Sequence, residues 1–385
     1  ATVTAYAGVG GLVGAAVNCT FFECWNEGDV GYYPSMEESG SGNLGIGVYM
    51  KMSNRAGGLV NNLINSSIDR CYNEGEVQGG SAGGLANITD YNTGYGEYPS
   101  SITNSYNTGH VYGMLNIGGI MAASSSNTLI DNCYNTGNIE SYLGGGGIVG
   151  ANYSSTITNC YNTGMVTGQT GVAGISGTNN GFNANISNCF NTGAVGVLGE
   201  DGGIFKILGG GIVGSNQTSQ GASVSNCYYG GNASSQLGGV QGGDVAGQAE
   251  YLPTLAEDAT TEDWFQNESV WNPDYPWNIG EDWFIVDGYP TLEAPITWLD
   301  DPSYYDHKFT GLGTQASPYL ITSNKELAGV AYLMLNYNDT YKNSYFRLTT
   351  NVDMSEYYWV PIGTTNALAF AGHFDGRNYT ITGLR

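Results

Sequence analysis

Cysteine is the first residue type in this sequence that could do chemistry. Five of the seven cysteines hold one position of a repeated motif, Cys71, Cys133, Cys160, Cys189 and Cys227. No Cys-x-x-Cys pair occurs and no histidine is near them in sequence, so we expect no metal site of the zinc type. A column of small buried thiols explains the pattern better, because Ser105 replaces cysteine in one copy. Whether Cys19 and Cys24 form a disulfide is left open, since geometry decides it.

Carboxylates are the second candidates, because a pair of them can hydrolyse a glycosidic bond. Glu37-Glu38 and Glu200-Asp201 lie in two insertions of the repeat. The simpler interpretation is that each is a solvated acidic loop. A polysaccharide lyase would also need a basic residue, and only four lysines and arginines precede residue 230. The three histidines belong to no Ser-His-Asp motif, so an enzyme is the less favoured alternative and no catalytic residue is assigned.

Aromatic residues recur at one repeat position, at Tyr72, Tyr106, Tyr134, Tyr161, Phe190 and Tyr228. If they point outward, they form a stripe that can stack on sugar rings or contact a protein. If they point inward, they are part of the core, and both alternatives stay open. The residues that we name as ligand-binding candidates are Tyr72, Tyr106, Tyr134, Tyr161, Glu200 and Asp201.

The charge balance excludes several classes of partner. Ten basic residues stand against 34 acidic ones, a net charge of -24. Nucleic-acid binding needs a dense basic surface, so it is not expected. No apolar run is long enough to cross a bilayer, so neither is membrane insertion. The many acidic and amide side chains permit calcium binding through oxygen ligands, but the sequence names no calcium site and no other cofactor.

The positions of these residues depend on an internal repeat of two alternating motifs. One is Gly-Gly followed by a branched aliphatic residue, as at 146–148, and the other is the Cys-Tyr-Asn-Thr-Gly type, as at 133–137. Successive copies of the cysteine position lie 47, 34, 28, 27, 29 and 38 residues apart. Such a unit is too short to enclose a core, so coils must stack. We expect an all-β, right-handed parallel β-helix of about seven coils over residues 1–250.

The side chains of each coil should divide by position. Aliphatic residues such as Ile148, Val149, Ile175, Ile212 and Val213 should point inward. Asparagine at a repeated corner tolerates a left-handed backbone, and its amide can bond its copies in the neighbouring coils. The insertions at 31–56, 88–101 and 196–209 should be loops on one face, often the binding face.

The composition changes near residue 250, since 52 of the 61 glycines precede it and six of the seven tryptophans follow it. We expect residues 251–292 to be an aromatic cap on the end of the β-helix, 293–303 to be a linker, and 304–385 to begin a second, incomplete β-helical module. Ser323 and Glu326 form a capping box, which predicts a helix near 324–337. Because Ala1 and Arg385 both interrupt a pattern, we expect an internal fragment of a longer chain.

These motifs resemble those of GLUG-motif bacterial surface proteins. The resemblance rests on Gly-Gly-(Leu/Ile)-Val-Gly at 10–14, 146–150 and 210–214, on the Trp-rich stretch that ends at 288–292, and on segments 317–321, 359–363 and 373–376. It covers most of the chain, although the coils near 85 and 174 lack parts of the motif. It implies a right-handed parallel β-helix in a large secreted or cell-wall protein, without one defined activity.

The favoured hypothesis is therefore an extracellular, non-enzymatic protein of the bacterial cell surface. It would be an adhesin that binds a glycan or a host or matrix protein through loops or faces of a β-helical rod. Two alternatives stay open. One is a β-helical enzyme that degrades polysaccharides, as a lyase or a glycoside hydrolase. The other is a purely structural stalk or fibre that associates with itself.

Overall fold

The computed structural model describes most of the chain and divides it into two compact units, residues 1–292 and 293–385. The described residues are 3–4, 8–31, 55–88, 99–125, 127–197, 209–218, 221–232, 240, 249–255, 261–265, 267, 270–271, 277, 279, 283–286, 289–292, 299, 302–357, 359–360, 362 and 368–384. The predicted acidic pairs Glu37-Glu38 and Glu200-Asp201 lie outside them.

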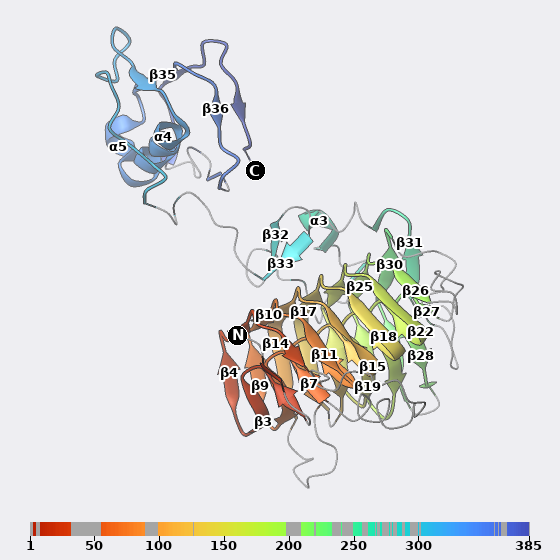
Figure 1. Ribbon diagram of the computed structural model, residues 1–385. Helices are drawn as coiled ribbons and strands as arrows, with labels where there is room; N and C mark the ends of the chain where they lie inside the picture. Colours follow the sequence, from red (N-terminus) through yellow and green to blue (C-terminus); the bar gives the residue numbers. More distant parts are fainter. Residues whose placement is uncertain are drawn as a thin grey trace, which may run out of the picture. The chain divides into compact units, whose positions relative to one another are not determined.

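Unit 1 is the expected parallel β-helix, built from three sheets that wind around a common axis (Figure 1). Sheet A contains β1 (Val3–Thr4), β2 (Val9–Gly10), β6 (Val30–Gly31), β7 (Arg55–Gly57), β11 (Val77–Gly79), β12 (Ser81–Gly83), β15 (Val111–Gly118), β18 (Ile139–Gly146), β22 (Val166–Ala173), β26 (Val195–Val197) and β27 (Gly209–Gly210). Sheet B contains β3 (Val13–Val17), β8 (Val60–Ile64), β13 (Ala86–Ile88), β16 (Met121–Ser124), β19 (Val149–Tyr153), β23 (Ser176–Asn180) and β28 (Val213–Asn216). Sheet C contains β4 (Thr20–Phe22), β5 (Trp25–Asn26), β9 (Ser67–Asp69), β10 (Tyr72–Asn73), β14 (Ser101–Asn107), β17 (Leu129–Asn135), β20 (Thr156–Thr158), β21 (Tyr161–Asn162), β24 (Asn185–Ser187), β25 (Phe190–Asn191), β29 (Ser223–Ser225), β30 (Tyr228–Gly230) and β31 (Glu250–Leu252).

Every strand pair of these three sheets is parallel and joins equivalent residues of successive coils. Tyr106, for example, lies opposite Tyr134, which lies opposite Tyr161 in the next coil. Aliphatic side chains therefore form continuous inward columns, and those of Ile148, Val149, Ile175, Ile212 and Val213 are fully buried, as predicted. Stacking supplies the interior that no single coil could enclose.

The cysteine column points inward, as predicted. Cys71, Cys133, Cys160, Cys189 and Cys227 are all buried in the main core of unit 1. The thiol of Cys133 donates to the backbone carbonyl of Asp131 at 3.2 Å, so each cysteine of this type acts as a small apolar residue with a local partner. Cys19 is exposed and Cys24 is partly exposed, and both are free thiols.

The expected asparagine ladder is present. From Asn26 to Asn191, each side-chain Nδ2 donates to Oδ1 of the equivalent asparagine in the next coil at 2.7–2.8 Å, through Asn73, Asn107, Asn135 and Asn162. The same Nδ2 also donates to the backbone carbonyl two residues further on, as Asn135 does to Gly137 at 2.7 Å. The ladder thus holds neighbouring coils together and closes the turn within each coil.

The left-handed corner is a different asparagine from the one in the ladder. Asn104, Asn132, Asn159, Asn188 and Asn226, which each precede the cysteine or serine of the motif, have positive φ between 47° and 52°. These corner asparagines also bond their copies, as expected, since Asn132 Nδ2 donates to Asn104 Oδ1 at 3.2 Å and Asn188 Nδ2 donates to Asn159 Oδ1 at 3.4 Å. The motif therefore carries two sets of amide contacts, and the shorter, continuous set belongs to the ladder asparagine.

The glycine of the second motif is required by the ladder. A Cβ on Gly147 would lie 2.1 Å from the carbonyl oxygen of Gly174 and 2.3 Å from the amide carbon of Asn162. No side chain can be accommodated at that distance. Only glycine at this corner therefore leaves room for the ladder asparagine packed against it.

Unit 2 has the beginning of a parallel stack and the predicted helix. Strands β34 (Tyr319–Ile321), β35 (Tyr345–Leu348) and β37 (His373–Asp375) form one parallel sheet, and β36 (Val352–Asp353) pairs in parallel with β38 (Ile381–Thr382). Paired residues Tyr319, Phe346 and Phe374 lie 27 and then 28 residues apart, which matches the shorter coils of unit 1.

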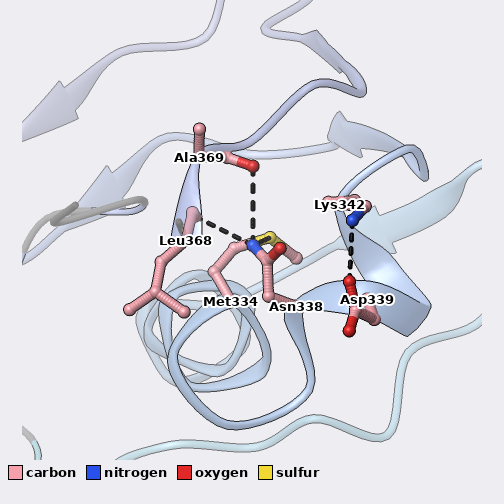
Figure 2. Close-up of polar contacts among 6 residues, drawn as sticks. All are labelled: Met334, Asn338, Asp339, Lys342, Leu368 and Ala369. Atoms are coloured by element: carbon pink, nitrogen blue, oxygen red, sulfur yellow. Dashed lines mark hydrogen bonds and ion pairs between the residues drawn. The ribbon is translucent and has the colours of Figure 1, made fainter. Parts of the chain in front are cut away.

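Helix α4 (Asn324–Asn336) begins at Ser323, whose hydroxyl accepts the backbone N–H of Glu326 at 3.2 Å. The carboxylate of Glu326 accepts from the backbone and hydroxyl of Thr322, one residue earlier than a capping box places it. Helix α5 (Asn338–Tyr341) follows. Figure 2 shows how Asn338 joins it to the chain before β37, with Nδ2 donating to the Leu368 carbonyl at 2.9 Å.

The asparagine ladder generates a stability prediction. Asn135→Ala should lower the free energy of unfolding by about 2–4 kcal/mol, because it leaves the Asn107 amide and the Gly137 carbonyl buried without these partners. Chemical denaturation monitored by circular dichroism measures this. Thr136→Ala, at the exposed neighbouring position, is the control and should change stability by less than about 0.5 kcal/mol. Equal effects of the two substitutions would contradict a structural role for the ladder.

The cysteine column generates a reactivity prediction. Burial raises the pKa of Cys71 to about 12 and raises the pKa of Cys160 and Cys227 well above the usual value. Because a reagent must reach the sulfur and the five column thiols are buried whereas Cys19 is exposed and Cys24 partly exposed, alkylation of the native protein at pH 8 should label Cys19 rapidly and Cys24 more slowly. The five buried thiols should react only after unfolding. Peptide mass spectrometry locates the labels, and native labelling of Cys133 at the unfolded rate would contradict the buried column.

Candidate functional site

The repeated aromatic residues point away from the interior of the coils, yet Tyr106, Tyr134, Tyr161 and Phe190 are buried, and Tyr72 and Tyr228 are partly exposed. Their rings stack face to face along sheet C, with centroids 4.8–5.1 Å apart from Tyr72 to Phe190. Burial increases along the column, from Trp25 at 53% exposed to Tyr106 at 9%, Tyr161 at 2% and Phe190 at 0%. The column is therefore a stripe on the outside of the coils, and another segment of the chain must cover it.

The Trp-rich segment covers it. Trp271 packs edge-on against Tyr228, Trp277 lies 5.6 Å from Phe190 between ring centroids, and Trp283 lies about 6 Å from both Tyr134 and Tyr161. The indole N–H of Trp283 donates to Oδ1 of Asn132 at 3.2 Å. As the chain proceeds, the segment thus runs back along the β-helix toward its N-terminal coils.

This arrangement corrects the expectation that residues 251–292 cap the end of the β-helix. Strand β31 does add one more rung to sheet C, and Val240 forms a bridge to Val213 of sheet B. The tryptophans, however, lie on the flank, with helix α3 (Glu262–Phe265) and the antiparallel strands β32 (Phe284–Val286) and β33 (Tyr289–Thr291) beside the column (Figure 1). A stripe of stacked rings offers the tryptophans more apolar surface than a single strand edge does.

The predicted ligand-binding stripe is therefore largely inaccessible. Tyr106, Tyr134 and Tyr161 are buried beneath the Trp-rich segment, and the Tyr161 hydroxyl donates to the Pro290 carbonyl. Only Tyr72, which is partly exposed, and Trp25 beside it continue the column beyond this cover. Glu200 and Asp201 lie outside the described residues, so of the predicted candidates only Tyr72 is both described and accessible.

A different surface of unit 1 gathers accessible polar and aromatic side chains. On the outward side of sheet A, parallel pairing places Gln78 beside Tyr112, Tyr112 beside Glu140, and Glu140 beside Thr167. The alternate residues Val77, Val111, Ile139 and Val166 are buried inward. Because side chains alternate between the two faces of a strand, this row must point outward. Four consecutive coils thus each contribute one polar side chain to it, of which Gln78, Tyr112 and Glu140 are accessible and Thr167 is buried.

A second row runs parallel to the first. Glu76 and His110 each precede the inward valine of their coil, as Asp29 does for Val30. The hydroxyl of Tyr112 donates to Oε1 of Glu76 at 2.7 Å, and its ring stacks on His110 with centroids 4.9 Å apart. Tyr112 is therefore held in one orientation by partners on its own coil and on the preceding one.

The charge around Tyr112 is strongly negative. Burial is the main cause that raises the pKa of Tyr112 above its usual value, followed by the hydrogen bond to Glu76 and the charges of Glu76, Asp29 and Glu140. The hydroxyl stays protonated at neutral pH and can donate a hydrogen bond. It cannot act there as an anionic base.

A shallow pocket of about 190 Å³ opens at this surface, lined by Gln78, Gly79, Gly80, Tyr112, Gly113, Met114 and Glu140. Three of these seven residues are glycines, and a Cβ on Gly113 would lie 1.8 Å from the Gly79 carbonyl oxygen. The pocket is smaller than the roughly 300–1,000 Å³ that encloses a drug-sized ligand. A pocket of this size can hold one ring of a ligand or one edge of an extended ligand. We call it the sheet A pocket.

The sheet A pocket was not predicted from the sequence, because its residues occur once each rather than as a repeat. The available signal was the column of valine and isoleucine at 77, 111, 139 and 166. An alignment of the coils on that column places Gln78, Tyr112 and Glu140 side by side.

The described part of the chain contains no group of three histidine, cysteine, aspartate or glutamate side chains placed to hold a metal ion. Nothing there assigns a site to the calcium that the composition permits. None of the described helices is long and apolar enough to span a bilayer.

Comparison with known proteins identified no relative of this chain. No protein-family model matches the chain, and neither the curated proteins nor the solved structures give a significant match. The resemblance to GLUG-motif proteins therefore stays a prediction from the sequence.

Tyr112 generates a pH prediction. Its folded-state pKa lies above the unfolded value of about 10, so its contribution to stability is complete below pH 10. That contribution is lost as pH rises further, because the unfolded phenol ionises first. NMR titration of ring-labelled tyrosine, assigned with Tyr112→Phe, should show Tyr112 titrating above ordinary tyrosines. Glu76→Gln should lower its pKa, and an ordinary pKa in the native protein would refute this electrostatic description.

Proposed function

We propose that this protein is an extracellular, non-enzymatic repeat protein of the bacterial cell surface that binds a glycan through the sheet A pocket. The observation that carries the proposal is the row Gln78–Tyr112–Glu140, which presents an amide, a phenol and a carboxylate at a pocket that three glycines also line. These groups can donate to and accept from sugar hydroxyls, and an accessible tyrosine edge can contact a sugar ring.

The chemistry of the pocket limits the glycan. No lysine or arginine lines it, and three carboxylates act on Tyr112. A uronic acid or a sulfated sugar would meet like charges there. Neutral hexoses and sugars with a free amino group fit the charge, so these are the ligand class that we propose.

The same features argue against the lyase alternative. Elimination from a uronate needs a base and a cation to stabilise the substrate carboxylate. Here Tyr112 is held protonated by burial and neighbouring carboxylates, and the pocket offers no cationic side chain. A non-catalytic binding surface is the simpler use of this geometry.

A glycan array followed by calorimetry tests the proposal on the 385-residue chain. Neutral or amino sugars should bind, and Tyr112→Ala or Glu140→Gln should weaken binding at least about tenfold, which corresponds to about 1.4 kcal/mol. Glu74→Gln is the matched control, because Glu74 is exposed on a neighbouring coil but does not line the pocket. Its affinity should be unchanged.

Three results would contradict the proposal. The first is binding to no glycan, as a purely structural stalk would show. The second is glycan binding that Tyr112→Ala leaves unchanged. The third is release of new reducing or unsaturated sugar ends during incubation, which would favour the polysaccharide-degrading enzyme.

A further inference from the structure

Unit 2 carries a cluster of accessible aromatic side chains, Tyr305, His307, Tyr332 and Tyr337. The first two belong to the segment before β34, Tyr332 lies in α4, and Tyr337 directly follows α4. His307 is exposed and Tyr337 is 53% exposed, whereas Tyr305 and Tyr332 are partly exposed. All four rings therefore present surface that a ligand can contact, and we call this cluster the unit 2 platform.

Two rings of the unit 2 platform lie side by side on a third. Tyr305 stacks on Tyr332 with ring centroids 4.4 Å apart and planes 17° apart. His307 stacks on the same ring, with centroids 5.3 Å and planes 22° apart. The centroids of Tyr305 and His307 are 6.5 Å apart, which is too short a distance for rings on opposite faces of Tyr332. Both rings therefore lie on one face of Tyr332 and are nearly parallel.

Hydroxyl groups meet at one side of this platform. The hydroxyl of Tyr332 has hydrogen-bond contact with those of Tyr305 and Tyr337. Partial burial is the first cause that raises the pKa of Tyr332, followed by the neighbouring Tyr337 and Tyr305, so this phenol stays protonated at neutral pH. The unit 2 platform thus combines ring faces with hydroxyl donors and acceptors, and none of its four members is an acid, a lysine or an arginine.

The segment 304–308, which carries two of the rings, is held against α4. The backbone N–H of Asp306 donates to the Lys325 carbonyl at 2.8 Å. A Cβ on Gly329 would lie 2.0 Å from the Asp306 carbonyl oxygen. Glycine inside a helix lowers the stability of that helix, but here it lets the segment approach closely. The rings are therefore ordered before any ligand binds, which reduces the entropy cost of binding.

Stacked rings beside hydroxyl groups complement the face of a sugar ring, because that face presents apolar C–H groups with hydroxyls around them. In a polysaccharide with equatorial linkages, successive sugar rings lie in one flat ribbon. Two parallel aromatic rings can stack on such a ribbon together, whereas a single sugar gains only one contact. The absence of acidic and basic members favours a neutral polymer over a charged one.

We propose that the unit 2 platform is a second glycan-binding site, which takes the flat ring faces of an insoluble, neutral, equatorially linked polysaccharide of the cellulose or chitin type. It shares no residue with the sheet A pocket, which we propose to hold one ring or one edge of a soluble glycan. The two sites therefore stand or fall independently.

Depletion of the 385-residue chain from solution by microcrystalline cellulose and by chitin tests this proposal. The unchanged chain should bind at least one of the two polymers. His307→Ala with Tyr337→Ala, both at exposed positions, should weaken that binding at least about tenfold. His307→Trp should strengthen it, because indole offers a larger ring face. Tyr379→Ala is the matched control in unit 2, since Tyr379 is 43% exposed and is not part of the platform, and it should bind like the unchanged chain.

Tyr112→Ala distinguishes the two sites. It should leave binding to the insoluble polymer unchanged, and the variant of His307 and Tyr337 should leave binding to soluble glycans unchanged. Loss of insoluble binding in Tyr112→Ala, with the platform variant unaffected, overturns this inference and leaves the sheet A proposal intact. A chain that binds neither cellulose nor chitin overturns it as well, provided that circular dichroism shows a folded protein.

Chemical modification tests whether the unit 2 platform is open in solution. Diethyl pyrocarbonate should modify His307 of the free chain as readily as an exposed histidine, and bound polysaccharide should slow this reaction. Peptide mass spectrometry locates the modified residue. Protection of His307 in the free chain would show that another part of the protein covers the platform, and would overturn the proposal.

Discussion

Parallel, in-register stacking of coils is the constraint on which unit 1 depends. Because each residue lies about 4.8 Å from its equivalent in the next coil, one choice of side chain is repeated as a column. Leucine and isoleucine columns make the core, the cysteines fill a narrow part of it, and asparagine forms a hydrogen-bonded ladder. A substitution at any of these positions therefore acts on three coils at once, its own and the two beside it.

The same stacking explains why the molecule needs its aromatic segment. Rings at one outward position of sheet C must stack on each other, and they create an apolar stripe that water would otherwise contact. Trp264, Trp271, Trp277 and Trp283 cover that stripe from Tyr134 to Tyr228. The covered part becomes a second core outside the coils, and function is left to surfaces such as sheet A, where the outward residues differ from coil to coil.

Periodicity made the fold predictable from the sequence. Repeated glycine, cysteine and asparagine positions indicated the coils, the inward thiols and the amide ladder, and Ser323 located the start of α4. The features that the sequence did not predict are not periodic. The placement of the Trp-rich segment depends on contacts between residues more than a hundred positions apart, such as Trp283 with Asn132. The sheet A pocket depends on Tyr112 and Glu140, which occur once and become neighbours only when coils of unequal length are brought into register.

The asparagine ladder also gives the rod an electrical direction. All five amide-to-amide bonds run the same way, with Nδ2 donating toward the C-terminal coils and Oδ1 accepting from the N-terminal side. Their dipoles are therefore aligned along the axis in a buried environment, where such chains polarise one another. The oxygen end of this line lies at Asn26 and the N–H end at Asn191. In this respect the ladder resembles a helix macrodipole built from side chains, and no ionisable group is needed to create it.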